Sequence, residues 1–454
     1  MSLDRINRTY QTIISRLKGG ELWEVLSHAR HYLAGDVSTK ALGFLSMPVF
    51  TRLLNQSDYG IVSVFMASLG ILSPLTTLNI SDSISRYFYE KGQTDFGIFL
   101  SSIIQFLLIL QVPLILLFLL FHERLMSFIG LPTSLSLLLV LSIFYQDILR
   151  VFRGVLISNK LSRPYVRVNV FQSYAGFGLS WILVATATVG LYFWRLLGVI
   201  AMQILSAVWM MWRIWGYIKW SKINWNHVRY SLDFALPRLP YVLSGIILSQ
   251  FDRLMLSSIN GVDQAGLYSV GYNVGGLSLL IIGAITPALM PNFYQLMNES
   301  KFREVDQLNR QIIWIICIAG IILMVFGGGL LRLLADEKFH EGAKVIPAIV
   351  MGYILFSITS IYNRYAGFYK KTVAESIPAL LAGLLNVFLN WIYLPKYGMI
   401  AAAYTTLVSY AAQAILARLI VVGMVQGHVA SLRLFLVPIA FTSVIFFLVS
   451  YWVF

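Results

Sequence analysis

Long apolar blocks alternate with short polar links along almost the whole chain. A helix that crosses the hydrocarbon core of a bilayer needs about 20 mostly apolar residues. Thirteen segments meet this requirement: 33–54, 60–84, 97–121, 131–149, 168–191, 196–217, 236–257, 265–290, 312–334, 345–368, 376–394, 398–419 and 434–453. The pattern predicts an all-α integral membrane protein with about 13 transmembrane helices.

The composition agrees with this prediction. Of the 454 residues 58% are hydrophobic and only 12% are charged, whereas soluble domains carry about 25% charged residues. The single cysteine, Cys317, provides neither a disulfide framework nor a cysteine-based metal site. We expect no metal and no cofactor. Residues 1–32 contain no cleavable signal pattern, and their basic, amphipathic character predicts a helix on the cytoplasmic membrane surface.

The net charge of +14 is explained by topology rather than by nucleic acid, because the short loops hold no aromatic and basic binding module. Lys and Arg are retained on the cytoplasmic side of short loops. With the N-terminus inside, the links on that side hold about three times as many basic residues as the links on the other side. This bias predicts a cytoplasmic N-terminus and, with thirteen spans, an external C-terminus.

Two stretches of the chain repeat at nearly equal offsets. Residues 57–64 resemble residues 263–270 at an offset of 206, and 198–201 resemble 398–401 at an offset of 200. The alternative is chance, since Gly followed by apolar residues is common where helices begin. A duplication predicts six-helix lobes at 33–217 and 236–424, a cytoplasmic linker at 218–235 and an additional helix at 425–454. Because six is an even number of spans, both lobes would have the same orientation in the membrane, as in transporters with parallel repeats. Two such lobes enclose a central cavity.

Charged side chains inside the predicted spans are candidate functional residues, because burying them in a membrane is costly. Three acid–base pairs lie at helical spacing: Asp36 with Lys40, Asp82 with Arg86, and Asp147 with Arg150. In one interpretation each pair only neutralises itself for membrane insertion. In the other, the three pairs line a polar interior.

Arg153 and Arg364 have no acid three or four residues away, and Arg253 directly follows Asp252. Arg153 and Arg364 either snorkel to the interface or face the cavity, where a guanidinium suits phosphate oxygens. Asp252 and Arg253 are adjacent near the outer end of the seventh predicted span and cannot share a helix face, and one interpretation is that they are ordinary boundary charges. The candidate substrate-binding residues are Lys40, Arg86, Arg150, Arg153 and Arg364. The candidate ion-coupling residues are Asp36, Asp82, Asp147 and Asp252.

Several short motifs resemble those of the Wzx-type polysaccharide flippases of the multidrug/oligosaccharidyl-lipid/polysaccharide exporter superfamily. They are residues 48–54 followed by Asp58-Tyr59-Gly60, residues 85–90, Asp252-Arg253 ahead of 265–270, and residues 386–390 leading to 394–403. The resemblance covers about residues 30 to 425. The thirteenth span departs from the plain twelve-helix pattern of this superfamily.

The resemblance implies a MATE-like fold and a function. Such a protein carries an undecaprenyl-pyrophosphate-linked oligosaccharide from the inner to the outer face of the bacterial cytoplasmic membrane by alternating access, for polysaccharide or O-antigen biosynthesis. Its partners are that lipid, the bilayer, H⁺ or Na⁺ as coupling ion, and other membrane proteins of polysaccharide assembly. The chain has no nucleotide-binding loop of the Gly-rich Lys-Ser/Thr type, which favours an ion gradient over ATP.

Two alternatives remain at this point. A cation-coupled multidrug antiporter of the same superfamily would have a similar architecture and an acidic cavity. A membrane polymerase or glycosyltransferase would need positioned acids or bases, often on a large external loop. The external links here are short, so an enzyme is the least supported of the three.

Overall fold

The computed structural model describes residues 35, 38–39, 41–91, 95–159, 161–371 and 373–453, and these are helical with no β-strand. The helices of the first half are Ala41–Leu53, α3 (Gln56–Thr77), α4 (Ser83–Lys91), α5 (Phe96–Phe128), α6 (Ser136–Ser158), α7 (Ser162–Thr186) and α8 (Leu191–Ile214). Those of the second half are α9 (Trp225–Ala235), α10 (Leu239–Ile246), α11 (Asp252–Asn260), α12 (Val262–Gly275), α13 (Leu277–Asn298), α14 (Phe302–Leu334), α15 (Ile346–Phe368), α16 (Val373–Met424) and α17 (Arg433–Val453). Short 3₁₀ turns η1 (Ile80–Asp82), η2 (Thr133–Leu135), η3 (Trp215–Tyr217), η4 (Leu236–Arg238) and η6 (Glu337–Val345) and the π turn η5 (Ile247–Phe251) connect them.

Eleven helices in the described part of the chain are long and apolar enough to cross a membrane, which confirms the all-α membrane fold. The helix Ala41–Leu53 is shorter, and α16 spans 52 residues. Gly398 interrupts α16 with φ 54° and ψ −138°, a conformation that favours glycine. This break falls between the predicted spans 376–394 and 398–419.

The region predicted as a linker, 218–235, differs from a simple loop. Its second part forms α9, whose Val228, Ser231 and Ala235 are buried. The Tyr87 hydroxyl of α4 lies 3.2 Å from His227 Nε2. The amphipathic pattern of α9 thus allows the segment to pack on the first half of the chain. A search for long apolar runs does not detect such a helix.

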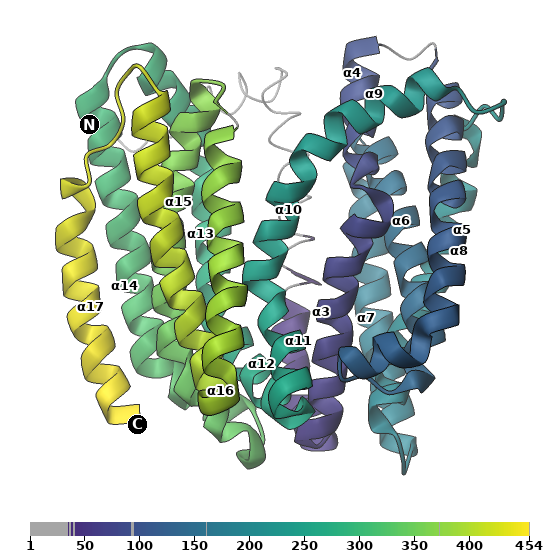
Figure 1. Cartoon of the computed structure of the whole chain (residues 1–454), viewed down its shortest axis with the longest axis horizontal. Coiled ribbons are helices and arrows are strands. Elements are labelled where there is room, and N and C mark those ends of the chain that lie inside the picture. Colours follow the sequence, from purple (N-terminus) through teal and green to yellow (C-terminus); the bar gives the residue numbers. More distant parts are fainter. Residues whose placement is uncertain are drawn as a thin grey trace, which may run out of the picture.

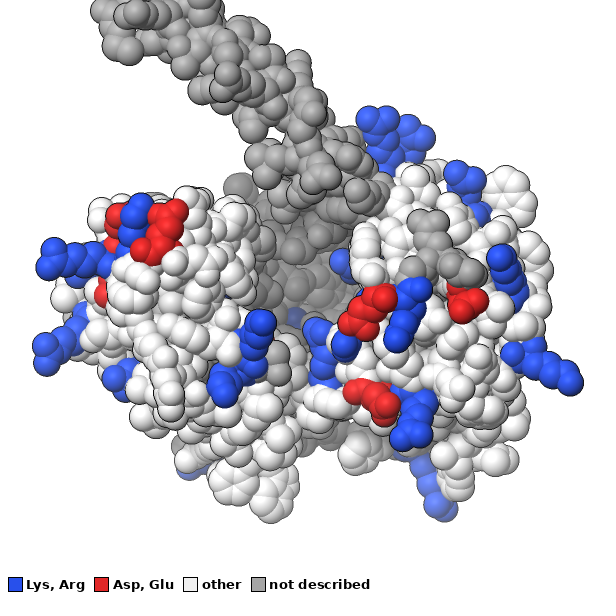
Figure 2. Space-filling view, turned by 90° about the horizontal axis from the view of Figure 1, so that it is seen from above, with Lys and Arg blue, Asp and Glu red and all other residues white. Residues whose placement is uncertain are grey.

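Figure 1 shows two helical bundles, α3 to α8 and α10 to α17, which approach each other where α11, α12 and the start of α3 meet and stand apart at the opposite end. Seen from that open end, a hollow separates them, with Lys and Arg side chains on both sides (Figure 2). The two bundles therefore form a structure closed at one end and open at the other.

Backbones touch where the bundles meet. A Cβ atom built on Gly60 of α3 would overlap the carbonyl oxygen of Val262, and one built on Gly266 of α12 would overlap that of Gln56. Glycine is needed at both positions because only a residue without a side chain allows helices to approach so closely. Gly60 and Gly266 are 206 residues apart, the offset of the repeat in the sequence.

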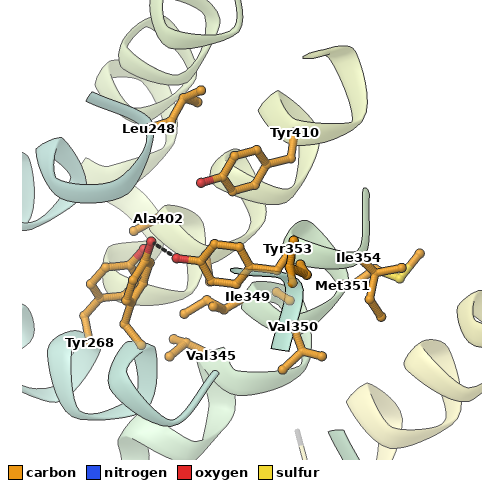
Figure 3. Close-up of a cluster of buried hydrophobic side chains, with 14 of the residues drawn as sticks. Leu248, Tyr268, Val345, Ile349, Val350, Met351, Tyr353, Ile354, Ala402 and Tyr410 are labelled. Atoms are coloured by element: carbon orange, nitrogen blue, oxygen red, sulfur yellow. Dashed lines mark hydrogen bonds between the residues drawn. The ribbon is translucent and has the colours of Figure 1, made fainter. Parts of the chain in front are cut away.

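The second bundle has a densely buried centre around α15. Tyr353 of α15 lies 2.6 Å, oxygen to oxygen, from the Tyr272 hydroxyl of α12, and its ring packs 5.8 Å from that of Tyr410. Figure 3 shows the rings of Tyr353 and Tyr410 among aliphatic side chains that include Ile349 and Val350. This rigid core supports the polar residues of α11, α12 and α16 described below.

Candidate functional site

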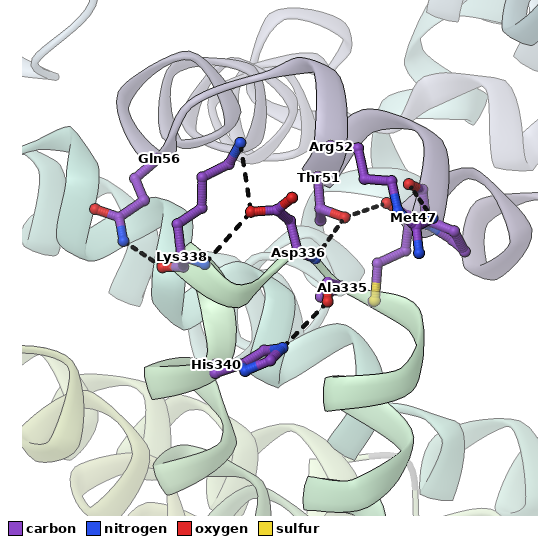
Figure 4. A network of polar contacts seen from close by, with 9 residues as sticks. Met47, Thr51, Arg52, Gln56, Ala335, Asp336, Lys338 and His340 are labelled. Carbon is purple, nitrogen blue, oxygen red and sulfur yellow. Dashed lines mark hydrogen bonds and ion pairs between the residues drawn. The ribbon is translucent and has the colours of Figure 1, made fainter.

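A polar seal closes the end where the bundles meet (Figure 4). The backbone N–H of Asp336 donates to Thr51 Oγ1 at 3.2 Å, and Gln56 Nε2 donates to the carbonyl oxygen of Lys338. The rings of Tyr59 and Phe339 pack edge to face, 5.3 Å between centroids. In each pair one residue belongs to the first half of the chain and the other to the second half, so the seal joins the two bundles.

A cavity of about 280 Å³ lies between the bundles. Both bundles line it, and among the described residues the lining contains two arginines and no Asp or Glu. Its lining residues are Gly43, Ser46, Phe50, Leu54, Tyr59, Val62, Ser63, Met66, Arg195, Gln250, Arg253, Ser269 and Asn273. The cavity is therefore polar and cationic.

Arg253 is held in a fixed orientation by its own helix and by α12. Its Nη1 donates to the carbonyl oxygen of Ser249 and to Gln250 Oε1, both at 2.8 Å, and its Nε donates to Ser269 Oγ at 3.1 Å. Its guanidinium carbon lies 4.4 Å from the centroid of the Tyr272 ring, within reach of a cation–π interaction. Only 6% of Arg253 is exposed. Such a guanidinium is positioned in advance for an anion.

Arg195 enters the same cavity from α8. Its guanidinium carbon lies 3.6 Å from the centroid of the Phe50 ring. Its buried Nη1 has no hydrogen-bond partner among the described residues. A buried donor without a partner costs about 1–3 kcal/mol. An anionic oxygen in the cavity would satisfy it.

Ser269 links the two bundles beside Arg253. Its hydroxyl donates to Ser63 Oγ of α3 at 2.9 Å, and these serines are 206 residues apart. The arginine of one bundle is thus connected through Ser269 to the other bundle. Movement of the bundles would break this link.

A π turn immediately precedes Asp252 and Arg253, which lie on different sides of their helix. The turn η5 ends at Phe251, immediately before both residues. π turns are rare and occur frequently at functional sites. Arg253 faces the cavity, while Asp252 points into the second bundle and is fully buried. The prediction that these neighbours do not share a helix face agrees with the structure, whereas their interpretation as boundary charges is wrong, because both are buried.

Asp252 is surrounded by hydrogen-bond donors. It accepts from the Tyr268 hydroxyl at 2.7 Å, from the Thr406 hydroxyl at 2.7 Å and from Asn390 Nδ2 at 2.6 Å. Hydrogen bonds to an ionised acceptor are stronger than neutral ones. These three donors stabilise the carboxylate in its ionised form.

More oxygens lie next to this carboxylate on α16. Asn390 Nδ2 also donates to Asn386 Oδ1 at 3.1 Å, and Thr405 donates to Asn390 Oδ1. Asn386 and Thr406 are hydrogen-bonded at 3.2 Å. Asp252 and the four α16 residues Asn386, Asn390, Thr405 and Thr406, all buried, form what we call the Asp252 cluster. It is rich in the oxygen ligands that hard cations prefer.

The predicted pair Asp36 and Lys40 lies outside the described residues. Asp82 and Arg86 are described, but no ion pair joins them: Asp82 Oδ2 accepts from Asn79 at 2.8 Å, and Arg86 binds Glu90 at 2.6 Å. The expected pairing is wrong here because Glu90 offers Arg86 a partner at the same helical spacing on the exposed side of α4. The Tyr230 hydroxyl and Arg86 lower the pKa of Glu90.

The third predicted pair also does not form a contact. Both carboxylate oxygens of Asp147 are buried and lack a hydrogen-bond partner in the described chain, and Arg150 Nη1 donates to Thr77 Oγ1 at 3.3 Å instead. The two side chains diverge because α3 offers Arg150 a hydroxyl group.

The two unpaired arginines lie in different places. Arg153 is exposed and its guanidinium carbon lies 5.6 Å from the Tyr165 ring centroid. Arg364 is 4% exposed inside the second bundle, where its Nη2 donates to Asn309 Oδ1 at 3.2 Å. Neither residue lines the cavity between the two bundles. Their roles in substrate binding, like those of Lys40, Arg86 and Arg150, stay predictions.

The sequence analysis did not assign the cavity to Arg195 or Arg253. The criterion that singled out Arg153 and Arg364, no acid three or four residues away, also holds for these two arginines. Applied uniformly, it would have included them.

Comparisons with known proteins agree with this fold. Residues 28–297, more than half of the chain, match the family model described as "Polysaccharide biosynthesis protein". The "Probable low-salt glycan biosynthesis flippase Agl15" of Haloferax volcanii is 21% identical over 83% of this chain and 79% of its own length.

Two solved structures share the architecture. "Lipid II flippase MurJ, inward closed conformation" superposes with a TM-score of 0.66 and 16% identity, over 92% of this chain and 97% of that one. "Crystal structure of MATE in complex with MaL6" superposes with a TM-score of 0.60 and 13% identity, over 93% and 96%. These likenesses establish the fold, and the family match confirms the resemblance noted in the sequence. The chain belongs to the polysaccharide biosynthesis protein family and has the all-α membrane fold shared by MurJ and MATE.

Proposed function

We propose that this protein is a flippase that moves an undecaprenyl-pyrophosphate-linked oligosaccharide from the cytoplasmic to the outer face of the bacterial cytoplasmic membrane. The observation that carries the proposal is the pair Arg195 and Arg253 in a cavity whose described lining has no Asp or Glu. Guanidinium groups bind phosphate oxygens through two parallel hydrogen bonds and stay charged. The Agl15 relative, described as a probable glycan biosynthesis flippase, supports the same substrate class.

The shape of the molecule suits a lipid with a large polar head. The end where the bundles stand apart carries basic residues on both sides of the hollow (Figure 2). We assign this end to the cytoplasm by the positive-inside rule. The sugar and pyrophosphate would enter the hollow there, while the polyprenyl tail remains in the bilayer. Opening of the seal at the other end would release them outside.

We assign the coupling cation, H⁺ or Na⁺, to the Asp252 cluster. Among the described acids predicted for coupling, Asp252 combines full burial with neighbouring amide and hydroxyl oxygens. Its neighbour Arg253 lies in the cavity and bonds to Ser269, which reaches Ser63 in the other bundle. A cation bound by Asp252 would therefore act one residue away from the substrate site.

The cavity chemistry disfavours a multidrug antiporter for cations. Such an antiporter needs acidic groups that attract its substrate, whereas the described lining of this cavity offers two guanidinium groups. An anionic substrate lowers the cost of burying these charges, and a cationic substrate raises it.

The test is transport of a lipid-linked oligosaccharide into proteoliposomes that contain the purified chain. Arrival on the far leaflet is read by a membrane-impermeant glycosidase, with and without a pH or sodium gradient. We expect Arg195→Ala with Arg253→Ala to lower the rate at least about tenfold, because a charge-assisted hydrogen bond contributes about 1.5–3 kcal/mol. Arg332→Ala, at an exposed arginine of α14, is the matched control and should transport normally.

The separate variants sharpen this test. Arg253→Lys keeps the charge but loses the planar fork, so we expect partial activity. Normal transport by the double variant, or efflux of a cationic dye in place of the lipid-linked sugar, would contradict the proposal.

A further inference from the structure

A wide apolar groove runs along the outside of the first bundle, between α7 and α8. Its volume is about 670 Å³. Phe171, Leu205 and Trp212 line it, with 59%, 57% and 72% of their surfaces exposed. Soluble surfaces rarely expose so many large apolar side chains together. In a membrane protein such a groove is filled by a lipid chain.

Two arginines lie in the lining of the same groove. Arg167 belongs to the first turns of α7 and Arg213 to the last turn of α8, so both lie at the same end of these antiparallel helices. Both are exposed, and no ion pair involves them in the described part of the chain. The groove thus has an apolar length and a cationic end.

The level of these arginines in the bilayer is indicated by tryptophans. Trp212 of the groove is followed by Trp215 and Trp220, whose rings lie 5.4 Å apart by centroid. Tryptophan is enriched at the level of the lipid head groups. Arg167 and Arg213 therefore lie where lipid phosphates are found.

The groove is separate from the proposed substrate site. Phe177 of α7 packs on Phe50, which lines the cavity between the bundles, with ring centroids 5.7 Å apart. Phe171, six residues earlier, lies about 120° around the same helix. The groove therefore faces lipid, away from the path between the bundles.

We propose that this groove is a binding site for an anionic phospholipid. The phosphate binds between Arg167 and Arg213, and one acyl chain lies along Phe171, Leu205, Trp209 and Trp212. Basic pockets between transmembrane helices on the cytoplasmic side suit anionic head groups. The site is independent of transport, but its assignment to the cytoplasmic leaflet rests on the orientation proposed above.

Native mass spectrometry of the full chain tests the site with two probes, phosphatidylglycerol and phosphatidylcholine with identical acyl chains. We expect the wild type to retain phosphatidylglycerol preferentially. Arg167→Ala with Arg213→Ala should weaken its binding roughly 30-fold, since each basic residue near a lipid surface contributes about 1 kcal/mol. Trp209→Ala should weaken the binding of both lipids.

The matched control removes two other exposed arginines, by Arg163→Ala with Arg229→Ala; Arg163 lies one turn from Arg167 but outside the groove. This variant should bind phosphatidylglycerol within about twofold of the wild type. Equal binding of the two lipids, or an equal loss in the control, would overturn the proposal. So would undecaprenyl pyrophosphate displacing phosphatidylglycerol through the same two arginines, since the groove would then bind the substrate. None of these readouts depends on transport, so they remain informative if the flippase proposal fails.

Discussion

Gly60→Ala is expected to lower transport at least tenfold. The added methyl group would overlap the carbonyl oxygen of Val262, which is backbone and cannot rotate away. Overpacking of this kind costs about 1–3 kcal/mol, and a cost in the middle of this range, about 2 kcal/mol, shifts a two-state equilibrium roughly 30-fold. The added methyl group forces α3 and α12 apart. The variant therefore destabilises the state in which the seal is closed.

The position of the bundles can be followed by labelling. In a chain carrying Cys317→Ser and Ser63→Cys, a membrane-impermeant maleimide added from the proposed outer side should react slowly, because the seal covers the cavity. Adding Gly60→Ala should speed this reaction. Gly70→Ala in the same helix is the control, since its Cβ would meet only Gln250 Cγ at 3.9 Å. Wild-type transport and unchanged labelling in Gly60→Ala would show that α3 and α12 do not need this close contact.

Asp252→Ala is expected to cost at least about 3 kcal/mol of stability and to abolish gradient-driven transport. The change leaves the Tyr268 and Thr406 hydroxyls and the Asn390 amide without their acceptor. Each buried donor without a partner costs about 1–3 kcal/mol. Thermal unfolding of the purified protein measures the first effect and proteoliposome transport the second.

Asp252→Asn separates structure from coupling. It keeps the shape and one carbonyl oxygen but removes the charge, so the protein should fold while its transport no longer responds to the ion gradient. Asp147→Asn is the matched control: Asp147 is also a buried carboxylate, but no hydrogen bond is lost with its charge. We expect its stability to change by less than about 1 kcal/mol. Gradient-dependent transport by Asp252→Asn would exclude Asp252 as the coupling residue.

The fold was predictable because bilayer thickness sets the length of every apolar block. The break of α16 at Gly398 could be predicted as well, since the polar link around Lys396 interrupts the apolar run there. The helix α9 could not be found this way, because its amphipathic face packs on protein and α9 has no long apolar run. Orientation is a prediction from the charge bias, and labelling of the two faces tests it.

The site was less accessible to sequence reasoning. Spacing indicates which side chains share one helix, as with Asp147 and Arg150, but not which other helix offers a better partner, as Thr77 does. The Asp252 cluster joins residues about 140 positions apart, from Asp252 to Asn390. The π turn ahead of Asp252 has no sequence signature that distinguishes it from α-helix. For these reasons the sequence shows Asp252 and Arg253 only as neighbours and does not indicate that their side chains have different surroundings.

The contact of Ser63 with Ser269 has a consequence for the origin of the chain. In an assembly of two identical subunits related by a two-fold axis, a residue meets its own copy only on that axis. Ser63 and Ser269, and likewise Gly60 and Gly266, hold equivalent repeat positions and meet across the interface. The interface has the geometry of a symmetric homodimer preserved within one polypeptide. These contacts are those expected if the two halves arose by duplication of one repeat, as the nearly equal offsets in the sequence predict.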